Sequence, residues 1–232
     1  MRRRLLIAAY AGVVLAGCAA PSAPPVASRA GAPADFPERT YRQEVRAGHA
    51  VYEIDPATSI AIIHVHRSGS LARLGHEHVV ASHDVAGYID PAAARADLYV
   101  AVERLAVDEP SLRQQAGLDT PLAEDAIAGT RRNMLTRVLD AARYPFAELQ
   151  VTGVETAGAM HVAHVRLTLH GATRTLDVPV TWQRSAQAFE VAGRFTLRQS
   201  DYGLTPLSIL GGAVQVADAV DVEFRLRARP IG

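Results

Sequence analysis

Four histidines stand in two His-x-His pairs, and they are the residues of this chain best suited to bind a metal. His64 and His66 form the first pair, and His76 and His78 form the second. Side chains at i and i+2 of a strand point to the same face, so each pair would present two imidazoles together. Two such strands paired across a hairpin would offer four imidazoles to one ion, and Zn or Cu would suit such ligands. Two other interpretations stay open: a polar ring at the mouth of a barrel that meets a ligand headgroup, and plain surface exposure.

The sequence shows no pairing of a nucleophile with a base. The stretch 68–70 (SGS) beside His66 is typical of a turn, and neither a Gly-x-Ser-x-Gly elbow nor a His-Glu-x-x-His helix is present. We therefore expect a binding protein with no required cofactor, and not an enzyme. Metal binding or a redox-linked role for the four histidines is the alternative function.

Cys18, the only cysteine, follows a short apolar run. Arg2–Arg4 and the apolar stretch 5–17 have the order of a secretory signal peptide, and the stretch is too short to span a bilayer. The run ends in Leu-Ala-Gly-Cys, which resembles the bacterial lipoprotein box, in which the chain is cut before the cysteine and the thiol receives lipid. We expect residues 1–17 to be a signal peptide and Cys18 to anchor the chain on the periplasmic side of a bacterial membrane. Ala19, in place of Asp, favours the outer membrane.

Residues 18–48 follow the signal and have the composition of a spacer. They are rich in Pro, Ala and Ser, which predicts an extended tether between membrane and domain. Without the signal, the chain carries 21 Arg, no Lys and 24 acids, a net charge of about −3. This charge argues against a nucleic-acid partner.

Residues 49–232 alternate between apolar and polar positions in several segments. In 216–228 the apolar set contains Val220, Val222 and Phe224, and the residues between them are charged. Such alternation is typical of antiparallel strands with one buried and one solvated face. The alternation stops between 110 and 142, where helix-like spacing predicts a helical insert that ends before Pro145. The expected fold class is therefore all-β, a closed barrel or sandwich with one helical insert.

Five segments together resemble the YceI-like family, the polyisoprenoid-binding proteins with a lipocalin-like barrel. In chain order they are 52–59 (YEIDPATS), 143–149 (RYPFAEL), 167–174 (LTLHGATR), 200–204 (SDYGL) and 216–222 (VADAVDV). The hairpin segment 167–174 is the most specific of them. The chain departs from the family at 75–78 (GHEH), where an ordinary apolar strand is usual.

The resemblance implies an antiparallel barrel of about eight strands over residues 49–232 that holds a long isoprenoid or fatty chain. An eight-stranded barrel either fills itself with side chains or leaves room for one ligand. The residues expected to line the interior are Val178, Val180, Trp182, Phe189, Phe195 and Phe224. The expected function is a lipid-anchored periplasmic protein that binds a long apolar amphiphile.

Overall fold

The computed structural model describes residues 31–158 and 160–232. The predicted signal peptide at 1–17 and the predicted lipid attachment at Cys18 lie outside the described residues. None of the helices in the described part of the chain is both long and apolar enough to cross a bilayer.

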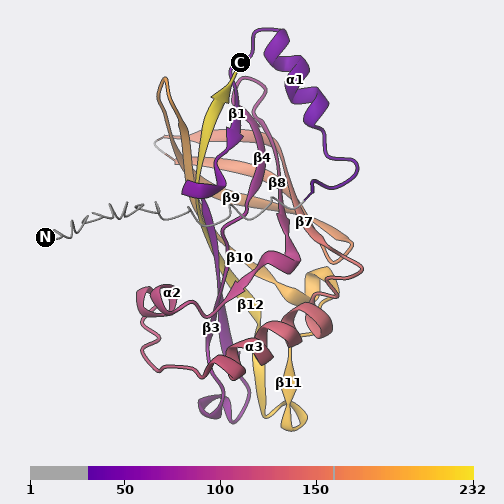
Figure 1. The fold of residues 1–232 in the computed structure, drawn as a ribbon, viewed down its shortest axis with the longest axis vertical. Coiled ribbons are helices and arrows are strands. Elements are labelled where there is room, and N and C mark those ends of the chain that lie inside the picture. Colours follow the sequence, from indigo (N-terminus) through magenta and orange to yellow (C-terminus); the bar gives the residue numbers. More distant parts are fainter. Residues whose placement is uncertain (1–30, 159) are drawn as a thin grey trace, which may run out of the picture.

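Eight antiparallel strands close into a barrel, as predicted (Figure 1). Around the barrel, β1 pairs with β4, then β5, β7, β8, β9, β10 and β12 follow, and β12 returns to β1. Their bounds are β1 Val51–Ile54, β4 Ala86–Asp90, β5 Arg95–Ala101, β7 Phe146–Ala157, β8 Met160–Leu169, β9 Ala172–Arg184, β10 Phe189–Arg198 and β12 Val214–Ile231.

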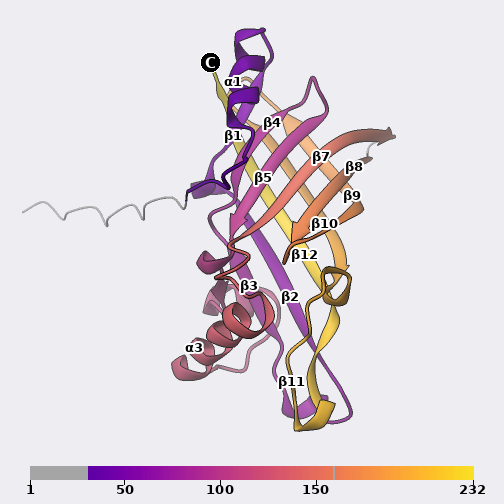
Figure 2. The same ribbon diagram turned by 90° about the vertical axis from the view of Figure 1, so that its right-hand side faces the viewer.

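The long strand β12 serves two partners along the same edge. Its C-terminal end pairs with β1, and the rest pairs with β2 (Ile60–Ser68). Beyond β2 the wall continues through β3 (His78–Ser82) to β6 (Ala106–Val107), and β11 (Ser208–Ile209) pairs with the start of β12. The barrel is therefore longer on this side, toward the lower end in Figure 2.

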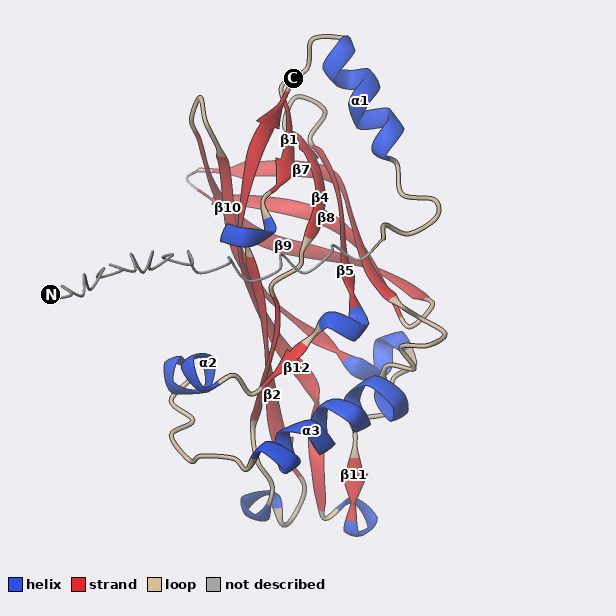
Figure 3. Ribbon diagram, in the orientation of Figure 1, coloured by secondary structure: helices blue, strands red, loops and turns tan. Residues whose placement is uncertain are grey.

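The helical insert expected at 110–142 is present at the lower end (Figure 3). It contains α2 (Pro110–Gln115) and α3 (Glu124–Asn133), which runs on into a π-helical turn over Met134–Val138. Leu112 of α2 packs on the outer face of β2 and β3, and Ile127 of α3 packs with Val107 of β6. Short 3-10 helices complete the chain at Pro56–Thr58, Ala72–Leu74, Val102–Arg104, Gln199–Tyr202 and Leu210–Gly212.

The segment expected to be an extended tether contains a docked helix, so that expectation is wrong for residues 38–46. Helix α1 (Glu38–Arg46) lies at the upper end of the barrel against β4 and β5 (Figure 1). Tyr41 is only 1% exposed, stacks on Tyr88, and donates a hydrogen bond of 2.7 Å to Asp97. The burial of one aromatic ring, with its hydroxyl hydrogen bonded, fixes this helix in spite of its polar composition.

The motifs that carry the family resemblance meet in pairs in space. In the β8–β9 turn, His170 and Gly171 both have positive φ, and the imidazole lies 4.4 Å from the Tyr144 ring of the 143–149 segment. A Cβ on Gly171 would lie 2.7 Å from that ring, so the turn requires glycine. In the same way, Asp218 accepts hydrogen bonds from both the backbone N–H and the hydroxyl of Ser200. These residues join loops to strands and leave the interior to apolar side chains.

Candidate ligand-binding site

The barrel encloses an apolar cavity of about 580 Å³. This volume lies within the range of pockets that hold small molecules, roughly 300–1,000 Å³. All six residues predicted to line the interior do line it: Val178, Val180, Trp182, Phe189, Phe195 and Phe224. Trp182, Phe195 and Phe224 are only partly buried, although they face inward. The barrel is therefore hollow, which the alternation of apolar residues could not decide.

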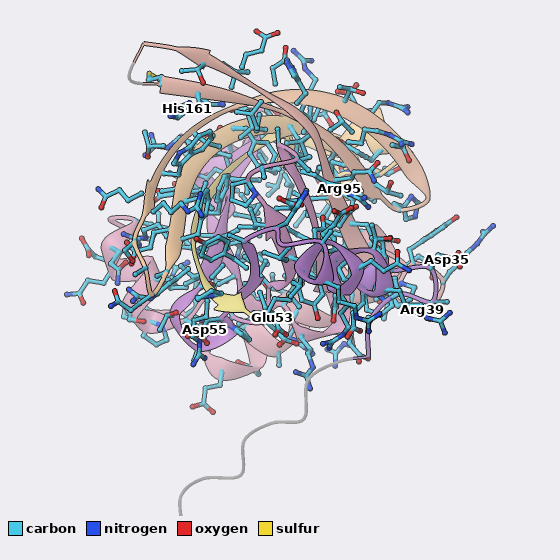
Figure 4. The ribbon with its side chains drawn as sticks, turned by 90° about the horizontal axis from the view of Figure 1, so that it is seen from above. Asp35, Arg39, Glu53, Asp55, Arg95 and His161 are labelled. Atoms are coloured by element: carbon cyan, nitrogen blue, oxygen red, sulfur yellow. The ribbon has the colours of Figure 1, made fainter. Side chains whose placement is uncertain are left out.

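The lining continues along nearly the whole barrel. Ile89 and Ala96 contribute near the upper end, and Leu207 and Val216 contribute near the lower end, where α3 adds Thr130. Seen from above in Figure 4, the side chains of the arching strands project into the enclosed space. The cavity is thus elongated and suits a chain-like apolar molecule.

Aromatic rings shape the upper part of the barrel. Trp182 stacks on His161, with ring centroids 3.6 Å apart and planes 9° from parallel, and His161 lies on the arch at the rim in Figure 4. Lower down, the Phe224 ring lies against Gly193, where a Cβ would approach the ring to 2.7 Å. Gly193 therefore gives this ring its room inside the barrel.

The structure does not bring the four predicted metal-binding histidines to one face. The register pairs His64 with Val79 and Val65 with His78, so His64 lies on the outer face while His78 lies on the inner face. His76 lies in the exposed loop before β3. The expected convergence of four imidazoles is wrong, because a pair on one strand cannot fix the register of the next.

His66 lies beside His64 on the outer face and makes surface contacts. Its Nε2 lies 3.0 Å from Asp221 of β12, and its Nδ1 lies 3.6 Å from Glu77. Hydrogen bonds from Thr196 and His66 lower the pKa of Asp221. The first His-x-His pair therefore links strands on the outside of the barrel.

Among the described residues, one group of three potential metal ligands lies within 4.8 Å, and it contains none of the predicted histidines. It consists of Glu44, His49 and Asp90 at the upper end. Asp90 is already occupied, since it accepts hydrogen bonds from the backbone N–H groups of Ala92 and Ala93 and contacts His49 at 2.7 Å. This contact raises the pKa of His49 and joins the loop after α1 to the end of β4.

His78 is part of a buried polar cluster that the sequence did not reveal. Its Nδ1 lies 2.6 Å from Oδ2 of Asp108, and Oδ1 of Asp108 accepts hydrogen bonds from the Val79 N–H and from Arg113. The side chain of Asp108 is fully buried and that of Arg113 is 8% exposed. Burial acts to raise the pKa of Asp108, but its hydrogen bonds with His78, Val79 and Arg113 together lower it.

Comparison with known proteins agrees with this architecture. A family model described as the YceI-like domain matches residues 52–228. A polyisoprenoid binding domain from Saccharophagus degradans, implicated in plant cell wall breakdown, superposes with a TM-score of 0.57 at 17% identity, over 79% of this chain and 100% of that one. Burkholderia cenocepacia BcnA superposes with a TM-score of 0.53 at 18% identity, over 75% and 98% of the two chains. No curated protein matches the sequence.

Proposed function

The chain belongs to the YceI-like domain family, and we propose that it is a lipid-anchored periplasmic carrier that holds a long isoprenoid or fatty chain inside its barrel. The observation that carries this proposal is the continuous apolar lining of the 580 Å³ cavity. Burial of an apolar chain contributes roughly 0.8 kcal/mol for each CH₂ group. A long tail can therefore bind with few polar contacts.

The similarity of the fold to a polyisoprenoid binding domain supports an isoprenoid as the ligand class. Inward side chains from many strands, including Leu149, Val165 and Val222, would contact the methyl branches of such a chain. The anchor at Cys18 would keep the carrier beside the membrane in which such molecules dissolve. Binding and release of the ligand need no bond making or breaking, so the proposed role is not enzymatic.

The first test is extraction of the purified full-length protein with organic solvent, followed by mass spectrometry. We expect a prenyl or acyl species in a stoichiometric amount. The variant Ala163→Phe places a large ring into the cavity, and we expect it to abolish this co-purification. Val162→Phe, on the outer face of the same strand, is the matched control and should retain the ligand. An extract without lipid from the wild-type protein would contradict the proposal.

The anchor requires a separate test. The Cys18→Ser protein should lose its acyl mass and leave the membrane fraction, while the barrel keeps its ligand. Continued membrane residence of this variant would contradict lipid anchoring without affecting the carrier role.

A further inference from the structure

Three ionisable side chains line the cavity in the described structure, and His78 is the one with a potential acceptor atom left free of hydrogen bonds. The other two, Asp90 and Arg95, lie at the upper end, where Asp90 contacts His49 and Arg95 donates to Asp97 at 2.9 Å. His78 lies near the lower end, opposite Val65, and its side chain is 17% exposed. Its Nδ1 faces Asp108, and within the described residues its Nε2 has no hydrogen-bond partner.

The surroundings of Asp108 fix which nitrogen of His78 carries the proton. Arg113 donates to Oδ1 at 2.9 Å and the Val79 N–H donates to the same oxygen at 3.1 Å, which keeps the carboxylate ionised. An ionised carboxylate only accepts hydrogen bonds, so Nδ1 of His78 must donate to Oδ2. In the tautomer that carries its single proton on Nδ1, Nε2 is an acceptor that faces the cavity.

Charge balance argues against an anionic headgroup at this position. The carboxylate of Asp108 is neutralised by Arg113, whose remaining contacts are to the backbone carbonyls of Glu77 and Thr120. Arg113 is therefore not free to pair with a phosphate at this position, and an unpaired buried charge is costly. A group that can donate one hydrogen bond and carries no charge fits the site.

We infer that His78 binds the terminal hydroxyl of a neutral long-chain alcohol, a prenol or a hydroquinone with a prenyl tail, with Asp108 as the positioning residue. This inference rests on the proposed carrier function and specifies the headgroup and its place. The apolar tail would extend from His78 toward Trp182 and the upper end of the cavity. The polar cluster thus gives the elongated cavity a direction.

The test measures binding of three probes with one C20 isoprenoid skeleton: geranylgeraniol, geranylgeranyl monophosphate, and the hydrocarbon in which hydrogen replaces the hydroxyl. Trp182, the only tryptophan, lines the cavity and reports binding by its fluorescence. We expect His78→Leu to weaken geranylgeraniol about five- to tenfold, the range of one lost hydrogen bond, and to leave the hydrocarbon unchanged. His64→Leu, on the outer face of the neighbouring strand, is the matched control and should change neither.

A second variant separates hydrogen bonding from folding. In Asp108→Asn, the carboxamide oxygen replaces Oδ1 opposite Val79 and Arg113, so the NH₂ group faces Nδ1 of His78. The imidazole must then carry its proton on Nε2 and becomes a donor toward the cavity. The aldehyde oxygen of geranylgeranial only accepts hydrogen bonds, so this variant should favour it. We expect the ratio of the affinity for geranylgeranial to the affinity for geranylgeraniol to be at least fivefold higher in Asp108→Asn than in the wild-type protein.

The outcomes distinguish a failure of the role of His78 from a failure of the carrier function. Equal loss of all probes in His78→Leu, tighter binding of the phosphate than of the alcohol, or an unchanged aldehyde preference in Asp108→Asn would overturn the role of His78 and leave the carrier function intact. If the wild-type protein binds neither the alcohol nor the hydrocarbon, the proposed carrier function fails, and this inference fails with it.

Discussion

Replacement of Tyr41 by Phe tests whether α1 is part of the folded domain. The hydroxyl of Tyr41 donates to Oδ2 of Asp97 at 2.7 Å, and both side chains are buried. Burial, together with this hydrogen bond, raises the pKa of Tyr41, so the hydroxyl stays protonated and can donate. The substitution removes this donor without changing the ring, and the stack on Tyr88 at 5.2 Å is retained.

The expected loss of stability depends on the hydrogen bonds that Asp97 retains in the Tyr41→Phe variant. Its Oδ2 still accepts from Nε of Arg95 at 2.9 Å, and its Oδ1 accepts from Gln150 at 3.0 Å. Because the carboxylate is not left without partners, the loss should fall near the lower end of the range for hydrogen bonds to charged groups, about 1–2 kcal/mol. Tyr41→Ala also removes the ring and should cost about 3–5 kcal/mol.

The assay is hydrogen exchange of the α1 amides in the native protein, combined with urea unfolding. A loss of 1–2 kcal/mol should reduce amide protection in α1 by roughly 5- to 30-fold. Tyr144→Phe is the matched control, since no hydrogen bond of its hydroxyl is found in the described structure, and it should stay within about 0.5 kcal/mol of wild type. Unchanged α1 protection in both Tyr41 variants would refute the docking of this helix.

Three further predictions follow from single residues. Tyr202 is 1% exposed, and its hydroxyl has no hydrogen-bond partner in the described structure. Tyr202→Phe should therefore raise the free energy of unfolding by about 1 kcal/mol in urea titrations. A decrease would show that the hydroxyl makes a hydrogen bond in the folded protein. His164 lies between Asp177 at 2.7 Å and Glu155 at 3.3 Å, which raises its pKa. Its contribution to stability is therefore present below the unfolded pKa of about 6.5 and is lost as the pH rises through the higher folded value, so an NMR titration midpoint at or below 6.5 would contradict this contact. Gly87 has φ of 140°, and a Cβ there would lie 2.1 Å from the carbonyl oxygen of Asp97. Gly87→Ala should therefore lower the unfolding free energy by at least about 2 kcal/mol. A thermal midpoint equal to that of wild type would show that β4 and β5 can separate without cost.

The antiparallel strands and their apolar faces were predictable from alternation, whereas the choice of a barrel over a sandwich came from the resemblance to the YceI-like family. Val178 and Val180 are two positions apart, so they must share a face, and the charged residues of β12 show which face is solvated. Whether that face is filled or hollow depends on the diameter of the closed barrel and on the side chains that meet across it. No single strand carries that information.

The histidine pairs show where local spacing stops being sufficient. The spacing correctly places His64 and His66 on one face, but the position of His78 depends on the loop 69–77 and on the pairing of Val65 with His78. Arg113 was not recognised because an arginine on a short helix is usually exposed. Its burial follows from tertiary contacts with Asp108 and the Thr120 carbonyl, which have no local signature.

Helix α1 was missed although its signal is present. Composition to residue 48 suggested a spacer, but Tyr41 and Val45 lie four positions apart, Glu38 is in the first turn, and Arg46 is in the last. The spacer composition ends at Pro37, and the helix begins at the next residue.

The docking of α1 sets the length of the spacer that would connect the barrel to a membrane anchor. With an anchor at Cys18, as proposed, a spacer that ran to Gly48 could span at most about 105 Å. A spacer that stops at Pro37 could span at most about 65 Å. The ring of Phe36 packs against that of Tyr99, with centroids 4.8 Å apart, so the spacer would leave the barrel beside β5. Docking of α1 would therefore keep the barrel closer to the bilayer than a spacer that continued to residue 48 would.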